Sequence, residues 1–198
     1  MASTDLIDVL RASGALKSGH FLLSSGRHSD QYIEKFDLLR NPEATSTACA
    51  GIAEQFRDAS IDVVVGPTTG GVILAFETAR QLGVAAAYAE RATSGSSARE
   101  FRRGTRFEAG SQVLVVDDIL TTGGSVRETL EALQAHQVSI VGIAVLVDRS
   151  GGAASIPSPW HALATVDASS WTAEECPLCQ RGEPLTKPGT TPKPGVGV

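Results

Sequence analysis

The stretch from Val113 to Ser125 limits most strongly what this chain can fold into. It begins with four apolar, mostly β-branched residues, Val113 to Val116, continues with the acids Asp117 and Asp118, and ends in a hydroxyl-rich glycine turn. Such an apolar run is typical of a strand buried on both faces of a parallel sheet, and we expect that strand to end at Asp117. Open α/β sheets bind their ligands at the carboxyl ends of such strands. The two acids therefore stand where a ligand is expected.

The turn from Thr121 to Ser125 predicts a phosphate site. Its glycines let backbone N–H groups approach an anion closely, and Arg127–His136 has the pattern of a helix whose N-terminus would face that anion. The preceding carboxylates would repel a phosphate, so ribose hydroxyls or a bridging Mg²⁺ are better partners for them. No Gly-Lys-Ser/Thr follows the glycines, which excludes the nucleoside-triphosphate loop. The stretch therefore predicts a site for a phosphorylated ribose.

An apolar strand, two acids, two apolar residues and a Thr-Gly-containing loop, in this order, resemble the signature of the phosphoribosyltransferases. A bare strand, turn and helix is the alternative interpretation of the same stretch. The resemblance implies that 5-phosphoribosyl 1-diphosphate, the donor of these enzymes, binds along Asp117, Asp118, Ile119, Leu120, Thr121, Thr122, Gly123, Gly124 and Ser125.

The N-terminal segment 19–35 indicates which group of phosphoribosyltransferases the chain resembles. It mixes glycines, hydroxyls, cations and an aromatic residue too irregularly for a core element, so we expect surface chain. Its Gly-His-Phe and Ser-Gly-Arg-His-Ser sequences are similar to the N-terminal hood of the orotate phosphoribosyltransferases, although Ser24 stands where many of these enzymes have a lysine or arginine. The resemblance implies that orotate would be bound by Thr121, Arg149, Arg27 and Tyr32.

A second glycine loop follows another apolar run, 61–66, and leads into a helix that we expect to continue through Leu82. An ordinary connection between strand and helix is one interpretation. In the phosphoribosyltransferases the corresponding loop receives the pyrophosphate part of the donor and often contains a cis peptide bond, which would here join Thr68 and Thr69. The residues implied in donor binding are Thr68, Thr69, Gly70 and Gly71.

Segment 92–104 follows a third predicted strand, 84–89, and is too polar and too rich in small residues to pack, so we expect it to be mobile. In orotate phosphoribosyltransferases a flexible loop at this place closes over the donor and supplies cations, commonly lysines and a histidine. Between Glu90 and Val113 this chain has neither. The resemblance therefore makes arginines the candidates, and a solvated charge cluster is the alternative. They are Arg91 for donor binding, Arg102 and Arg103 for catalysis, and Arg99.

The remaining patterns complete an α/β fold. Helices are expected at 5–13 and 44–57, the second after an Asn-Pro start, and strands at 138–147 and 161–166, the last at the sheet edge. The resemblance implies the type I phosphoribosyltransferase fold, a central parallel sheet of about five strands flanked by helices under a small N-terminal hood, and the alternation of strands and helices agrees with it. Residues 1–40 would form the first helix and the hood, 41–183 the phosphoribosyltransferase core and 184–198 a disordered tail.

The three cysteines argue against a disulfide framework, because their number is odd. Cys49 lies in a predicted helix, where a small buried residue is the expected role. Cys176 and Cys179 form a single C-x-x-C sequence, which is half of a metal site. We therefore favour a reduced structural pair over a bound metal.

Net charge and hydropathy argue against a nucleic-acid-binding protein and against a membrane protein. A net charge of −5 leaves no electrostatic footprint for nucleic acid, and no apolar run approaches the length of a membrane span, so we expect a cytoplasmic protein. The resemblance implies transfer of the phosphoribosyl group to orotate, with Mg²⁺, in a homodimer. Thr121 favours orotate, because purine enzymes usually carry an acid at this place. A purine-salvage phosphoribosyltransferase and a non-catalytic nucleotide-sensing regulator of the same fold stay open as alternatives.

Overall fold

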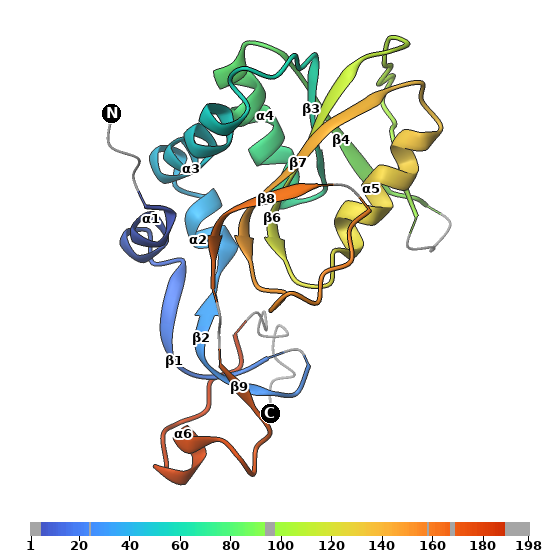
Figure 1. The fold of residues 1–198 in the computed structure, drawn as a ribbon. Coiled ribbons are helices and arrows are strands. Elements are labelled where there is room, and N and C mark those ends of the chain that lie inside the picture. The colour runs from blue at the N-terminus through green and yellow to red at the C-terminus, as the bar shows by residue number, and fades with distance from the viewer. Residues whose placement is uncertain (1–4, 24, 94–97, 158, 167–168, 189–198) are drawn as a thin grey trace, which may run out of the picture.

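The computed structural model describes residues 5–23, 25–93, 98–157, 159–166 and 169–188. Its main body is a six-stranded sheet (Figure 1). Five strands pair in parallel, as the sequence predicts, and a short antiparallel strand is added at one edge. In spatial order the strands are β5 (Arg99–Glu100), β4 (Ala85–Arg91), β3 (Val63–Pro67), β6 (Gln112–Leu120), β7 (Ser139–Asp148) and β8 (Trp160–Thr165).

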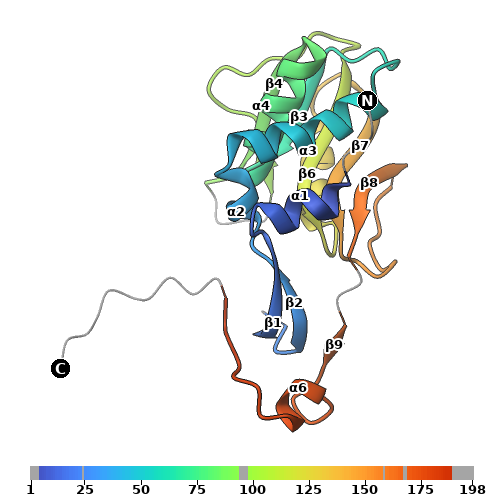
Figure 2. The ribbon, with the colours of Figure 1, turned by 90° about the vertical axis from the view of Figure 1, so that its left-hand side faces the viewer.

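Helices cover both faces of this sheet. One face carries α1 (Leu6–Ala12), α2 (Lys35–Leu39), α3 (Pro42–Gln55) and α4 (Gly70–Leu82), and the other carries α5 (Gly124–Gln134), as Figures 1 and 2 show. Side chains of β6 alternate between the two sides, so that Leu114 packs in the cluster with α3 and α4 while Val115 packs in the cluster with α5. Both are fully buried, which explains the uninterrupted apolar run in the sequence.

Local signals set the helix ends. Asn41 caps α3 by accepting a hydrogen bond from the Ala44 N–H at 3.1 Å, and Pro42 occupies the first turn. Gly83 ends α4 with a left-handed φ of 74°. Cys49 of α3 is fully buried, and burial raises the pKa of its thiol to about 11, which confirms its expected role as a small core residue.

β6 is longer than predicted. Its pairing with β7 continues from Asp117 opposite Val145 to Leu120 opposite Asp148, so the strand does not end at Asp117. The prediction was wrong because the apolar run stops at Val116, whereas backbone pairing with the long β7 holds the acids within the ladder. Consecutive strand residues point to opposite faces, and Asp117 and Asp118 are therefore separated by the sheet.

The segment expected to be irregular surface chain is an antiparallel hairpin of β1 (Leu16–Leu22) and β2 (His28–Ile33). β9 (Ser170–Trp171) extends it to a three-stranded sheet, next to which lies α6 (Pro177–Gln180) (Figures 1 and 2). We call β1, β2, β9, α6 and the chain up to residue 188 the hood. The strands could not be predicted from the sequence, because exposed and buried residues do not alternate along β1 and the pairing of β1 with β2 contains a register shift.

The C-terminal segment belongs to the hood in space. The Leu22 N–H donates to the Thr186 carbonyl and the Thr186 N–H donates to the His20 carbonyl, both at 2.8 Å. Thr186, in the predicted disordered tail 184–198, is thus paired with β1, and residues 189–198 lie outside the described part of the chain. No helix within the described residues is long and apolar enough to cross a membrane.

Candidate active site

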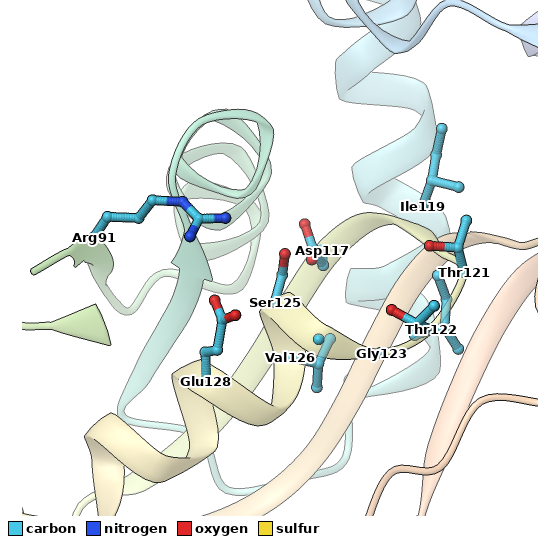
Figure 3. Close-up of a pocket in the computed structure, with 11 residues that line it drawn as sticks. Arg91, Asp117, Ile119, Thr121, Thr122, Gly123, Ser125, Val126 and Glu128 are labelled. Atoms are coloured by element: carbon cyan, nitrogen blue, oxygen red, sulfur yellow. The ribbon is translucent and has the colours of Figure 1, made fainter. Parts of the chain in front are cut away.

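A hollow of about 240 Å³ opens where β6 ends and α5 begins (Figure 3). It brings together predicted donor-binding residues from two separate parts of the chain, and it adds two that the sequence did not indicate, Val126 and Glu128. In Figure 3 the Arg91 side chain reaches toward Asp117 and Ser125 from the side opposite the threonines. The lining residues are Arg91, Asp117, Ile119, Leu120, Thr121, Thr122, Gly123, Gly124, Ser125, Val126 and Glu128.

The N-terminus of α5 forms one wall of this hollow. Gly123 is its N-cap with a left-handed φ of 77°, and no side chain caps the helix. Arg127 stabilises the turn by donating hydrogen bonds to the Thr122 carbonyl at 2.7 Å and the Ser155 carbonyl at 2.9 Å. The uncapped first-turn N–H groups and the positive end of the helix dipole suit an anion.

The acidic pair has two different environments. Asp117 is buried on the α5 side, and burial together with the neighbouring Asp118 carboxylate raises its pKa to about 7. Asp118 lies on the opposite side, where the Lys35 ammonium is 2.8 Å from Oδ2 and donates to Oδ1 at 3.1 Å. Asp117 is therefore the carboxylate of the pair that faces the hollow, and Asp118 already has a cation.

Lys35 is a residue that sequence reasoning missed. It is the first residue of α2, directly after the hood, and is far from the acidic pair in the sequence. The signal available was weak, since a lone lysine after a strand is usually solvated. Its contact with Asp118 depends on how α2 packs against α3 and α4.

The second glycine loop lies beside the first. The Thr68–Thr69 peptide bond is cis, as the resemblance implied. Thr69 is the N-cap of α4 and makes no side-chain cap, so a second helix N-terminus is open to an anion. A Cβ atom built on Gly70 would lie 1.9 Å from Asp118 Oδ2, which explains why glycine is needed where this loop meets the acidic pair.

Arg99 joins the two loops. Only 6% of its surface is exposed, and its guanidinium donates to Glu128 at 3.1 Å, to the Thr68 hydroxyl at 3.3 Å and to the Ser125 hydroxyl at 3.5 Å. Arg99 is therefore packed into the site, although it belongs to the segment that the sequence predicted not to pack. The prediction was wrong here because β5 pairs with β4, placing Arg99 opposite Arg91.

The two arginines predicted to be catalytic lie outside the hollow. Arg102 pairs with Glu100 and donates to the Thr93 hydroxyl at 2.8 Å, while Arg103 is exposed and lies 3.2 Å from Glu90. Both belong to the described flanks of the predicted mobile segment, whose residues 94–97 are outside the described part of the chain. Arg91 is the arginine that the structure places in the hollow.

The predicted orotate-binding residues come from three elements. Arg149 follows β7 and is half-buried, which lowers its pKa, and Tyr32 of β2 is near enough for the two groups to affect each other's pKa. Arg27 is exposed on the β1–β2 turn, where it donates to the Ser170 hydroxyl at 3.0 Å and carbonyl at 2.5 Å. Ser24 lies outside the described residues.

Comparison with known proteins identifies the family. Residues 37–176 match the model of the phosphoribosyl transferase domain. The chain belongs to the phosphoribosyltransferase family, whose members are pentosyltransferases.

Individual relatives carry a more specific name than the family model does. An orotate phosphoribosyltransferase from Caldicellulosiruptor bescii is 42% identical over 187 residues, which cover 94% of this chain and 97% of that one. One from Pelotomaculum thermopropionicum is 41% identical over 190 residues, covering 96% and 98%. The crystal structure of orotate phosphoribosyltransferase from Aeropyrum pernix is similar with a TM-score of 0.70 and 32% identity, and covers 81% of this chain and 93% of that one.

Proposed function

We propose that this protein is an orotate phosphoribosyltransferase of pyrimidine biosynthesis. It would transfer the 5-phosphoribosyl group from its diphosphate donor to orotate, giving orotidine 5′-monophosphate and pyrophosphate. The observation that carries the proposal is the pair of uncapped helix N-termini, of α4 and α5, on either side of the acidic strand end. Two anion sites around carboxylates suit a ligand with a phosphate at each end of a ribose.

The donor would lie along the hollow with its 5′-phosphate at the N-terminus of α5. The N–H groups of Gly124 and Ser125 would hold that phosphate, and the Thr122 and Ser125 hydroxyls would donate to it. Asp117 would accept hydrogen bonds from ribose hydroxyls. The diphosphate would then point toward the N-terminus of α4, near Thr69 and Arg91.

Breaking the bond at ribose C1 develops positive charge on the sugar and negative charge on the departing diphosphate. Arg91 is the cation that reaches into the hollow, and we assign it to the diphosphate charge. Arg102 and Arg103 are held by Glu100 and Glu90, and they would have to leave these acids to cover the donor. Their catalytic role therefore stays a prediction that requires closure of the segment.

The acidic pair also fits Mg²⁺. Carboxylate oxygens are the ligands this ion prefers. Asp117 is a buried carboxylate that faces the hollow, whereas Asp118 is paired with Lys35. When bound, the ion would neutralise the diphosphate and so favour its departure. Asp117 would hold it directly or through water while Lys35 keeps Asp118 in position.

Orotate would bind under the hood. The half-buried Arg149 offers a guanidinium for the orotate carboxylate, and the Thr121 hydroxyl, exposed at the hollow, can donate to the carboxylate or a ring carbonyl. Tyr32 of β2 and Arg27 of the hairpin turn would complete this set of donors. A carboxylate-bearing base suits this set of donors better than a purine does.

We further propose a cytoplasmic homodimer. Support for a dimer comes from the outer face of α4, where Phe76 is 66% exposed and Ile73 37% exposed, since a second copy of the chain would remove these side chains from water. Light scattering of the eluting protein tests the oligomeric state. A mass of one chain at micromolar concentration would contradict it.

Loss of orotate absorbance with purified protein, donor and Mg²⁺ tests the activity, with uracil, hypoxanthine and adenine replacing orotate in parallel. We expect turnover with orotate alone. Arg149→Gln should lower kcat/KM for orotate at least ~10-fold without weakening donor binding, because one charged hydrogen bond contributes about 1.5–3 kcal/mol. Arg57→Gln, which replaces an exposed arginine just after α3, is the matched control. Turnover with a purine, or tight donor binding without any turnover, would refute the proposal.

A further inference from the structure

Four side chains with metal-binding atoms meet in the hood. They are His20 of β1, His28 of β2, Cys176 at the start of α6 and Cys179 within α6. One ligand atom from each lies within 4.8 Å of all the others. The single C-x-x-C of the sequence, which is half of a metal site, thereby acquires two histidines as its second half.

The separations match a tetrahedral zinc site. His20 Nε2 lies 3.5 Å from Cys176 Sγ and 3.7 Å from Cys179 Sγ, and His28 Nδ1 lies 3.3 Å from Cys179 Sγ. Zinc bonds of about 2.0–2.1 Å to nitrogen and about 2.3 Å to sulfur put nitrogen and sulfur ligands roughly 3.5 Å apart in a tetrahedron. The two ring nitrogens, 2.9 Å apart, need to separate by only a few tenths of an ångström.

A second contact orients the first histidine. His20 Nδ1 lies 2.8 Å from the Glu183 carbonyl oxygen, which can only accept a hydrogen bond, so Nδ1 carries the proton. The neutral ring then presents its Nε2 lone pair to the cluster. Zinc-bound histidines are commonly held in this way through their other nitrogen.

Burial also favours a metal. His20 is 4% exposed, His28 5% and Cys176 0%. Cys179 is exposed, so an ion can reach the cluster from solvent. Thiols and imidazoles at this spacing are soft ligands that select zinc over magnesium.

The described part of the hood buries few apolar side chains of its own. Among the described residues, its buried apolar side chains outside the two main core clusters are those of Phe21, Cys176 and Leu178. Small units with so little apolar burial usually depend on a disulfide or a metal for stability. The cluster connects both strands of the hairpin to the C-terminal segment. Arg27, in the turn of the hairpin, donates a hydrogen bond to Ser170 of the same segment.

We propose that the protein binds one zinc ion through His20, His28, Cys176 and Cys179, and that this ion fastens the C-terminal segment to the hood. Four protein ligands close the coordination sphere, so the role is structural and the ion takes no part in phosphoribosyl transfer. The site shares no residue with the hollow at the end of β6. This replaces the reduced structural pair that the sequence favoured.

The test measures metal content of untagged full-length protein, purified without chelator, by elemental mass spectrometry. We expect about one zinc per chain in the wild type and in Cys49→Ser, whose buried cysteine lies in α3 away from the cluster, and loss of zinc in Cys179→Ser. Cys179 is chosen because it is exposed, so that the variant folds. His28→Asn, from the other half of the site, should lose the metal as well.

Cobalt provides the second measurement. The chain with Co²⁺ in place of zinc should show the intense visible bands of tetrahedral coordination and the near-ultraviolet band of thiolate ligands, and Cys179→Ser should weaken the latter. Metal-free protein that shows neither band after addition of Co²⁺, or a disulfide between Cys176 and Cys179 in the purified protein, would overturn the proposal. Neither readout depends on turnover, so the zinc proposal is tested independently of the orotate assay.

Discussion

Replacing Asp117 with asparagine should change how the stability of the ligand-free protein depends on pH. The folded protein raises the pKa of Asp117 from its ordinary 3.8 to about 7, through burial and then through the charge of Asp118. A raised pKa means that the folded state holds a proton more tightly than the unfolded chain does. The resulting stabilisation is complete below pH 4 and is lost as the pH rises through 7.

The size of the effect follows from the same shift. Between pH 5 and 7 the folded state keeps a proton that the unfolded chain has released, and each of these units corresponds to about 1.4 kcal/mol. Wild type should therefore lose about 2–3 kcal/mol of unfolding free energy relative to Asp117→Asn between pH 5 and 8. The asparagine has the same shape and carries no titrating proton, so other groups cancel in the comparison.

Urea denaturation followed by the fluorescence of Trp160 and Trp171 at pH 5, 6, 7 and 8 measures this difference. Asp8→Asn is the control, because that carboxylate is 71% exposed in α1 and its replacement should shift the curve by less than ~0.5 kcal/mol at every pH. If wild type and Asp117→Asn differ by a constant amount across the range, the carboxyl does not titrate near neutrality and the electrostatic argument for Asp117 fails.

Three further substitutions test packing, two of them beside the site and one in the core. Gly70→Ala would put a Cβ 1.9 Å from Asp118 Oδ2, so titration calorimetry should show donor affinity at least ~10-fold weaker, while circular dichroism stays unchanged. Arg99→Met removes the 2%-exposed partner of Glu128 and should cost about 3–5 kcal/mol in urea denaturation, against less than ~1 kcal/mol for the exposed Arg57→Met. Gly142→Ala meets Phe56 Cε1 at 2.5 Å and should cost about 1–3 kcal/mol, with part recovered by adding Phe56→Leu.

Each of these has a clear contrary result. Unchanged donor affinity in Gly70→Ala would mean that Asp118 does not help to hold the donor. Equal losses for the two arginine variants would mean that Arg99 behaves as a surface residue. No recovery in the Gly142→Ala, Phe56→Leu pair would show that the contact with Phe56 is not the cause of the loss.

Features that depend on neighbouring residues could be predicted from the sequence. The glycine turn before α5, the Asn41-Pro42 start of α3 and the alternation of apolar strands with helices all follow from local backbone preferences and from burial of a parallel sheet. The predicted donor-binding residues from Asp117 to Ser125 that line the hollow could be named for the same reason, because they lie in one continuous segment.

Features that depend on which segments become neighbours were decided only by the tertiary structure. Lys35 reaches Asp118 because α2 packs against α3 and α4, and Arg99 became a buried link because β5 pairs with β4. The same holds for His20 and the distant C-x-x-C, which meet only after the chain returns to β1. A cation, a carboxylate or a thiol has the same local pattern whether it is solvated or paired. Its role is set by long-range contacts, which no window along the chain contains.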